Sequence, residues 1–293
     1  MREDLFAQFL FSGLATGSIY ALIALGFCLI HNATGIVNFA QGDFLTLGGM
    51  FMVTLFVGLH LPLPIAFLLA VLAVALVGML IERCLIRPAV SDEVLILIFI
   101  TIGASIFIRG VIKLTWGKRP LALPPFSGEE PVKILGAYLM PQSLWIFAIT
   151  ILVVGVLFWF FKATRYGKAM RAVACNPRAA MLMGIPVERI RLLAFLLSGA
   201  LGAVGGVLIT PITTVSFDSG VMIGLKGFSA AVLGGYGNVM GAVVGGLILG
   251  VLESLGAGFV SSSYKDAIAF LVLLLILFVR PRGILGKGEG ERA

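Results

Sequence analysis

The sequence predicts an all-α polytopic integral membrane protein with about eight transmembrane elements, one of which is a Gly-rich broken-helix hairpin. Of the 293 residues, 60% are hydrophobic and 12% are charged, whereas soluble domains have about 45–50% and about 25%. The mean hydropathy is +1.11. Because one spanning helix needs about 20 apolar residues, the spans use up most of the chain. We therefore expect residues 1–293 to form a single transmembrane domain.

Seven apolar stretches account for most of the predicted spans. They run roughly over residues 5–30, 36–58, 62–82, 93–112, 143–161, 191–210 and 266–280. The eighth element, 222–256, is Gly-rich, and the sequence GGYGN at its centre, 234–238, is a turn signal. We expect two short helices in a hairpin, which either crosses the membrane twice or is re-entrant. The first apolar stretch is too long for the core of a cleavable signal peptide, so we expect it to be retained.

Glycines recur at four-residue spacing in several of these spans. The pairs are Gly13/Gly17, Gly202/Gly206, Gly241/Gly245 and Gly246/Gly250. This spacing lets helix backbones approach closely in lipid. It predicts helix packing, either inside one bundle or against a second subunit; the alternative is a pore-lining role.

Lysine and arginine set the predicted orientation. The net charge of +7 fits a membrane protein with basic cytoplasmic loops, and we expect no nucleic-acid partner. Three groups of basic residues place the 83–92 loop, the loop 162–191 and the C-terminus in the cytoplasm. Arg83 and Arg87 mark the first of these segments, and Arg280, Arg282 and Lys287 mark the C-terminus. The loop 113–142 and, by parity, the N-terminus then face outward.

The cytoplasmic loop 162–191 carries seven basic residues and one acid, Glu188. Asn176 can cap the first amides of a helix, and Pro177 suits the first helical position. Gly184 can adopt the left-handed conformation that ends a helix. The pattern predicts a helix of about two turns, which is too short to be stable alone in water. We interpret it as a docking element for a soluble partner; the alternative is an amphipathic connector on the bilayer surface.

The docking segment resembles the EAA-x3-G signature in permease subunits of ABC importers. Ala179 and Ala180, three residues and Gly184 match the signature, and Arg178 stands where the signature has Glu. In such permeases the signature forms a coupling helix that fits a cleft on the ATPase. The resemblance thus implies that six residues couple this chain to an ATPase: Asn176, Pro177, Arg178, Ala179, Ala180 and Gly184.

Five segments, in order over nearly the whole chain, resemble the high-affinity branched-chain amino acid permeases of the LivH type. They are residues 16–26, 35–43, 171–195, 226–235 and 281–286. The resemblance implies a bacterial inner-membrane permease that works with a second related permease, two ATP-binding subunits and an extracytoplasmic binding protein. The implied cargo is leucine, isoleucine, valine or a related small amino acid. Relatives also carry urea and short amides, which is the alternative cargo.

A polar segment enters the second apolar stretch. Asn38, Gln41 and Asp43 are costly within a membrane and usually face a cavity or a partner there. Gly42 permits a helix break, which is tolerated where backbone lines protein or water. We assign these residues to the translocation pathway or its gating; the alternative is that Asp43 is solvated at the interface.

Several other polar residues occur in or near the spans. Thr101 and Ser105 share a helix face and can line a polar path, or can bond their own backbone carbonyls. We expect Glu253 to face the exterior aqueous rim, pairing with a basic residue being the alternative. Arg109 is expected to extend its charged group to the interface. His31 and His60 are expected to lie in short loops without acting as ligands.

Motifs for chemistry are absent from the sequence. It contains no G-x4-G-K-[ST] loop for ATP phosphates, no H-E-x-x-H zinc motif and no G-x-S-x-G elbow. We therefore expect no catalytic residue, no cofactor and no metal, with ATP hydrolysed by partner subunits. The competing class is an ion-coupled secondary transporter, which needs a buried acid or histidine relay; Asp43 and Glu253 are the candidates. The three cysteines lie far apart, at Cys28, Cys84 and Cys175.

Overall fold

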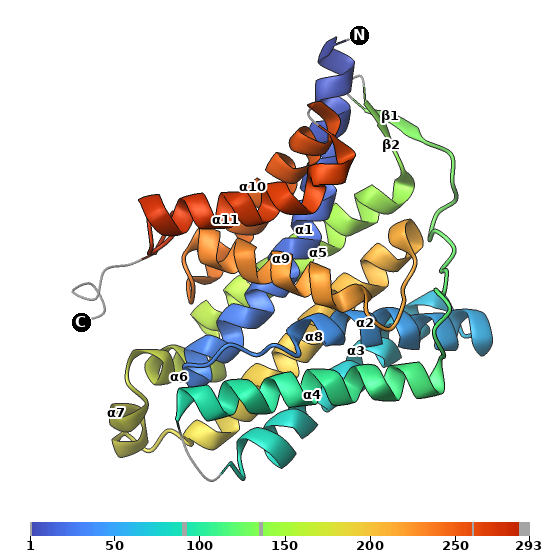
Figure 1. The fold of residues 1–293 in the computed structure, drawn as a ribbon. Coiled ribbons are helices and arrows are strands. Elements are labelled where there is room, and N and C mark those ends of the chain that lie inside the picture. Colours follow the sequence, from blue (N-terminus) through green and yellow to red (C-terminus); the bar gives the residue numbers. More distant parts are fainter. Residues whose placement is uncertain (1, 90–92, 135–136, 260, 287–293) are drawn as a thin grey trace.

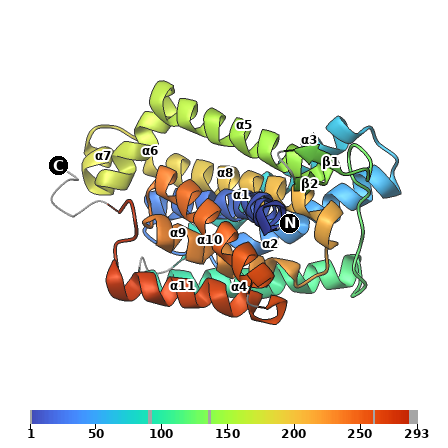
Figure 2. The ribbon, with the colours of Figure 1, turned by 90° about the horizontal axis from the view of Figure 1, so that it is seen from above.

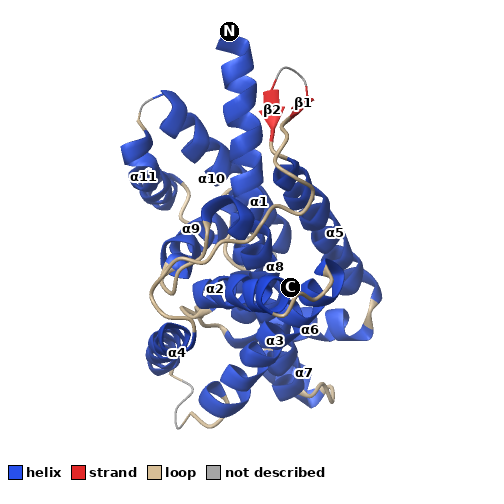
Figure 3. Ribbon diagram, turned by 90° about the vertical axis from the view of Figure 1, so that its right-hand side faces the viewer, coloured by secondary structure: helices blue, strands red, loops and turns tan. Residues whose placement is uncertain are grey.

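The computed structural model describes residues 2–89, 93–134, 137–259 and 261–286 and is almost entirely helical (Figures 1 and 3). The helices are α1 (Arg2–Thr34), α2 (Gln41–Met52), α3 (Leu63–Ile81), α4 (Val94–Thr115), α5 (Pro141–Ala163), α6 (Arg165–Cys175), α7 (Pro177–Leu182), α8 (Val187–Thr213), α9 (Ser219–Gly234), α10 (Val239–Phe259) and α11 (Lys265–Val279). Short π-helical turns, Val53–Gly58 and Glu82–Ile86, extend α2 and α3, and a 3-10 turn, Ser262–Tyr264, precedes α11. Strands β1 (Val132–Ile134) and β2 (Ala137–Leu139) form an antiparallel hairpin.

Eight helical segments of the described chain are long and apolar enough to cross a membrane, which confirms the predicted fold class. The Gly-rich hairpin has its turn where the sequence predicts it, between α9 and α10. Its two helices are unequal, which corrects the expectation of two short ones. Helix α10 has 21 residues, whereas the 16 residues of α9 extend only about 24 Å at 1.5 Å per residue.

Helix α1 lies at the centre of the bundle (Figure 2), and its packing against α10 explains two of the glycine pairs. A Cβ atom on Gly250 would lie 2.3 Å from the Cα of Gly17, and one on Gly17 would lie 2.8 Å from the carbonyl oxygen of Gly246. No side chain larger than hydrogen fits between the two backbones. For the contact between α1 and α10, the predicted packing role of these glycines is confirmed.

The remaining glycine pairs also lie at helix crossings. On α8, a Cβ on Gly206 would lie 1.9 Å from the carbonyl oxygen of Leu45 in α2. On α10, a Cβ on Gly245 would lie 2.1 Å from the carbonyl oxygen of Ala230 in α9. These contacts place the backbone of α8 against that of α2, and the backbone of α10 against that of α9.

The second span does not begin as a helix, although the sequence suggested a continuous apolar stretch over 36–58. Gly35 has φ +76°, and residues 35–40 run as irregular chain before α2 starts at Gln41. The side chain of Gln41 lies against Gly26 of α1, eight residues before the end of that helix. At 1.5 Å per residue, α2 therefore begins beside a point on α1 that lies roughly 12 Å before the end of that helix.

The two ends of the bundle hold different segments (Figure 1). At one end, the amide of Gln8 donates to the carbonyl of Tyr138 at 2.7 Å, and the amide of Tyr138 donates back to Gln8 at 2.8 Å. The N-terminal part of α1 therefore lies beside the β-hairpin. At the other end lie α6, α7 and residues 281–286, where the amide of Ile284 donates to the carbonyl of Leu233 at 2.9 Å. The segments at this end are ones that the basic residues assign to the cytoplasm, and the β-hairpin at the opposite end belongs to the loop 113–142, which was assigned to the outside.

Candidate functional site

Helix α7 is a short, capped helix at the end of the bundle (Figure 1). The side chain of Asn176 accepts a hydrogen bond from the amide of Ala179 at 3.0 Å, and Pro177 is the first helical residue. Gly184 has φ +79°, and its amide donates to the carbonyl of Met181 at 3.0 Å. The local start and stop signals in the sequence therefore predicted the right helix.

The two sides of α7 have different surroundings. Ala180 is buried in the core cluster that also contains residues of α1, α6 and α8, whereas Arg178 is exposed. The apolar residues at its tip are exposed: Met181, Leu182 and Met183. An exposed apolar tip on a helix anchored by its opposite side is the arrangement that a docking partner could cover.

Helix α6 was not predicted, because the basic loop was expected to hold one short helix, over residues 176–184. It starts where the hydroxyl of Thr164 accepts a hydrogen bond from the amide of Gly167 at 3.0 Å. Met170 and Val173 are buried on its inner face. Their spacing of three residues, with the basic residue Arg171 between them, was the signal available in the sequence.

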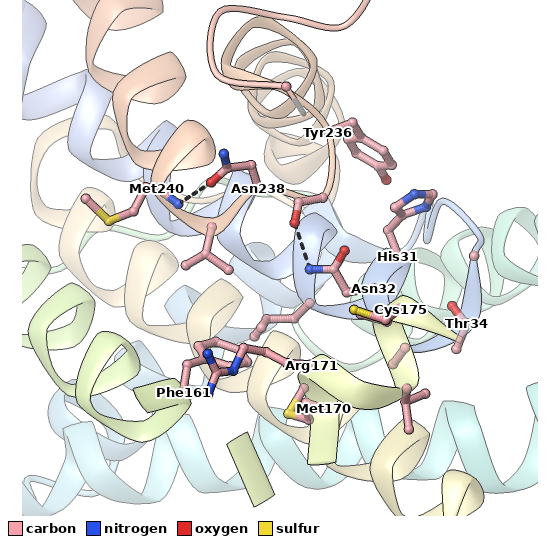
Figure 4. Close-up of a pocket in the computed structure, with 18 of the residues that line it drawn as sticks. His31, Asn32, Thr34, Phe161, Met170, Arg171, Cys175, Tyr236, Asn238 and Met240 are labelled. Atoms are coloured by element: carbon pink, nitrogen blue, oxygen red, sulfur yellow. Dashed lines mark hydrogen bonds between the residues drawn. The ribbon is translucent and has the colours of Figure 1, made fainter. Parts of the chain in front are cut away.

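A groove of about 1030 Å³ separates α6 from the α9–α10 turn (Figure 4). Arg171 lies on one side, and Tyr236 and Asn238 lie on the other. Between them, the amide of Asn32 on α1 donates to the carbonyl of Gly237 at 2.8 Å. Burial raises the pKa of the Tyr236 phenol, so this group stays neutral.

Asn38, Gln41 and Thr101 hold the irregular segment before α2 in place. The side chain of Asn38 accepts from the amide of Ala40 at 3.1 Å. The hydroxyl of Thr101 accepts from the amide of Phe39 at 3.2 Å and donates within its own helix to the carbonyl of Ile98 at 2.8 Å.

Gln41 is fully buried and is bound by α8. Its side chain accepts from the hydroxyl of Ser198 and donates to the carbonyl of the same residue at 3.2 Å. The carbonyl oxygen of Gly26 lies 3.0 Å from the same Ser198 hydroxyl, so the one hydrogen of that hydroxyl is shared between the two acceptors. Gln41 therefore joins α1, α2 and α8 at the point where the irregular chain becomes a helix.

Gly42, Asp43 and Ser105 line a second cavity, of about 260 Å³, between α2, α4 and α9. Asp43 is buried, with 2% of its surface exposed, so it is not solvated at the interface. Its Oδ1 lies 3.7 Å from Nε of Arg109, which also lines the cavity. Arg109 was expected to extend to the membrane surface; instead it turns toward a carboxylate on a neighbouring helix.

Comparisons with known proteins cover nearly the whole chain. Residues 9–277 match the family model for the branched-chain amino acid transport system permease component. The chain belongs to this permease family. It is 37% identical to the high-affinity branched-chain amino acid transport system permease protein LivH of Salmonella typhimurium, over 98% of this chain and 97% of that protein. It is 35% identical to the permease protein BraD of Pseudomonas aeruginosa, over 98% of each chain.

A solved structure shows that the permease fold recurs at low sequence identity. PsaBC from Streptococcus pneumoniae, determined in complex with Fab, superposes with a TM-score of 0.54 at 14% identity and covers 96% of this chain and 97% of that one. The similarity concerns the fold alone. Together with the membrane-spanning helices, the family membership identifies the chain as a multi-pass membrane permease.

The permease also contains a charge cluster around the buried side chains of Lys226 and Glu253, which the sequence did not predict. Its members, from four helices, are Tyr20, Lys226, Glu253, Lys265 and Asp266. Nζ of Lys226 lies 2.9 Å from Oε1 of Glu253 and 2.6 Å from Oδ1 of Asp266. Nζ of Lys265 lies 3.3 Å from the same Glu253 oxygen, and the hydroxyl of Tyr20 donates to Oε2 at 2.8 Å.

Glu253 was expected to face the aqueous rim, and this expectation is wrong: its side chain is fully buried. A carboxylate within a membrane protein needs cations and donors, and the charge cluster supplies both. The signal in the sequence was a lysine in one apolar helix and an acid in the next. Pairing with a basic residue, which was the alternative interpretation of Glu253, is the arrangement in the structure.

Proposed function

We propose that this permease is the transmembrane subunit of an ATP-driven importer for leucine, isoleucine, valine or a related small amino acid. It would lie in the bacterial inner membrane, with residues 1–293 as one transmembrane domain and the loop 162–191 in the cytoplasm. The observation that carries the coupling part of the proposal is α7, a capped helix with an exposed apolar tip. The full-length similarity to permeases of branched-chain amino acid transport systems supports the cargo class.

The proposed complex contains partners that supply what this chain lacks. Two ATP-binding subunits would dock on α7 and hydrolyse ATP, so that no catalytic residue belongs to the permease. A second, related permease would complete the pathway, and an extracytoplasmic binding protein would deliver cargo. Asn176, Pro177, Arg178, Ala179, Ala180 and Gly184 are the proposed coupling residues.

The packing around α7 provides a route for the coupling motion. Ala180 of α7, Val173 of α6 and Ile190 of α8 belong to one buried core cluster, together with Leu29 near the end of α1. Because packed cores transmit displacement with little compression, a movement of α7 would shift the ends of α1 and α8. Gln41, at the start of α2, is bound to Ser198 of α8, and the Ser198 hydroxyl is in turn bound to the carbonyl of Gly26 in α1.

The proposed pathway passes the cavity between α2, α4 and α9. Gly42, Asp43 and Ser105 line it, and we assign Asn38, Gln41 and Thr101 to gating, because their hydrogen bonds fix the irregular segment beside it. Irregular backbone within a membrane is typical of the sites at which transporters hold their cargo.

The proposal is tested by uptake of labelled leucine into vesicles that hold the reconstituted complex. Uptake is expected with ATP and the binding protein, and not with an imposed proton gradient instead. Gradient-driven uptake without ATP or partner subunits would establish the ion-coupled transporter. ATP-driven uptake of urea but not leucine would retain the importer and replace the cargo.

Replacing Gly184 by valine is expected to uncouple transport from ATP hydrolysis. Gly184 has φ +79°, and no other atom lies within 4 Å of the position that a Cβ would occupy, so the cost is local strain of about 1–2 kcal/mol. That strain opposes the docking conformation and should slow ATP-driven uptake about tenfold. Gly128→Val is the matched control, since Gly128 has φ +89° and equally open surroundings but lies in the loop 113–142. Equal uptake by the two variants at equal abundance would contradict the coupling role.

The orientation predicts which cysteines react from which side. Cys84 and Cys175 are exposed and Cys28 is buried. With Cys84 replaced by serine, a membrane-impermeant thiol reagent should label Cys175 in inside-out vesicles and not in intact cells. Labelling in intact cells would reverse the proposed sides.

A further inference from the structure

We propose that Asp43 and Arg109 bind the ammonium and carboxylate groups of an amino acid as it passes through the cavity between α2, α4 and α9. This inference rests on the proposed import function and names the chemistry that the pathway would recognise. It adds Arg109 and the aromatic wall of the cavity to the residues that contact cargo.

The two charged groups are close but incompletely satisfied by each other. Nε of Arg109 and Oδ1 of Asp43 are 3.7 Å apart, beyond the usual hydrogen-bond distance of about 2.7–3.2 Å. Nε of Arg109 also donates to the carbonyl of Ser105 at 3.4 Å. In the part of the chain that the structure describes, its Nη atoms make no hydrogen bond. A guanidinium has five N–H donors, so most of its capacity is available to a ligand.

Opposite charges at this separation match an α-amino acid, whose ammonium and carboxylate groups are attached to one carbon. The Asp43 carboxylate can accept from the ammonium group, and the Arg109 guanidinium can donate two parallel hydrogen bonds to the carboxylate. The side chain of Arg109 is 31% exposed and that of Asp43 is 3% exposed. The guanidinium therefore lies nearer the opening and the carboxylate deeper in the cavity.

The rest of the cavity is suited to an aliphatic side chain. Phe27, Phe39 and Phe228 line it, and the rings of Phe27 and Phe228 lie 5.6 Å apart in an edge-on arrangement. Its volume of about 260 Å³ is below the range of about 300–1,000 Å³ that is common for drug-sized ligands. A charged pair beside an apolar wall favours a small zwitterion with an aliphatic side chain over urea or a short amide, which lack both charges.

Glycine backbone forms the side of the cavity where α2 crosses α9. A Cβ on Gly42 would lie 2.1 Å from the carbonyl oxygen of Gly220, and one on Gly224 would lie 2.9 Å from the Cα of Gly42. The crossing places the N-terminal ends of both helices at the cavity. Helix N-terminal ends attract anionic groups, which adds to the field that Arg109 provides for a carboxylate.

The competing interpretation is an ion pair that only holds α4 against α2. Helix α4 lies at the edge of the bundle (Figure 3), where such an ion pair would be useful. The two interpretations differ in the double variant. If the pair is structural, removing both charges leaves no buried group unpaired and restores what either single change loses. If the pair binds cargo, the double variant loses both contacts.

The first experiment compares Asp43→Asn, Arg109→Gln and the double variant in the reconstituted complex. Each single change should lower leucine uptake about tenfold or more, the loss expected for one charge-assisted hydrogen bond, while the complex assembles and still hydrolyses ATP. The double variant should be at least as slow. Arg87→Gln, at the exposed ion pair with Glu188, is the control and should transport normally. Uptake restored in the double variant, or unchanged in both single variants, would overturn the proposal.

The second experiment measures occupancy without transport. Ser105→Cys, with Cys84 and Cys175 replaced by serine, places a thiol on the cavity wall. Leucine should slow its reaction with a small thiol reagent, whereas 3-methylbutylamine and 4-methylpentanoate, each lacking one charged group, should not. The protection should disappear with Asp43→Asn. Equal reaction with and without leucine would reject the site. Protection in a complex that fails to take up leucine with ATP would retain the site and reject the import function.

Discussion

Replacing Lys226 by methionine is expected to lower the free energy of unfolding by about 3–5 kcal/mol. The change leaves Glu253 fully buried without its nearest cation, at 2.9 Å. Lys265 is farther, at 3.3 Å, and 47% exposed, so it compensates poorly. The loss should be visible as a lower thermal unfolding midpoint and a lower yield of monodisperse protein in detergent.

Two further variants separate this electrostatic effect from lost packing. Adding Glu253→Gln to Lys226→Met removes the unpaired charge and should recover part of the lost stability. Arg87→Met breaks an ion pair whose side chains are 44% and 65% exposed, and it should cost less than about 1 kcal/mol. A Lys226→Met protein as stable as the Arg87→Met protein would show that the charge cluster contributes little.

Replacing Gly250 by alanine is expected to push α1 away from α10 and to lower the stability of the bundle. The new methyl group would lie 2.3 Å from the Cα of Gly17 and 2.5 Å from the carbonyl oxygen of Gly13. These are backbone atoms, which cannot move as a flexible side chain can. Overpacking of this kind costs about 1–3 kcal/mol, so the unfolding midpoint in detergent should fall.

Gly155→Ala is the matched control for Gly250→Ala at the contact between α1 and α10. Gly155 lies inside α5, and a Cβ added there would meet no other atom within 4 Å. Alanine is favoured over glycine in a helix by about 1 kcal/mol, so this variant should be as stable as the parent or more stable. Equal destabilisation by both changes would mean that helix propensity and not the close approach decides the outcome.

The sequence predicted best what depends on neighbouring residues. Asn176, Pro177 and Gly184 start and end α7 through contacts within the same nine residues, and hydropathy marks the spans because each must be apolar over its own length. The turn between α9 and α10 is likewise encoded by adjacent glycines.

Features that depend on residues far apart in the chain were missed. Glu253 is buried because Lys226, 27 residues away, lies on a neighbouring helix, and no periodicity predicts that pairing. Arg109 turns inward because α2 presents Asp43 beside α4. The irregular chain before α2 is bound by Thr101 of α4, and Gln41, where α2 begins, is bound by Ser198 of α8. For the candidate pathway, Gly42, Asp43 and Ser105 could be named from sequence, whereas Arg109 and Phe228 required the fold.

The packing of α1 against α10 also governs when the protein can be completed during synthesis. Tyr20 and Glu253, which bond across this pair of helices, are 233 residues apart in the chain. At about 5–20 residues per second, α1 waits roughly ten to fifty seconds in the bilayer before its partner has been made. During that time Gly13 and Gly17 present an uncovered backbone surface. A nascent chain that stops before residue 239 lacks α10, so the face of α1 that carries Gly13 and Gly17 stays without its partner helix.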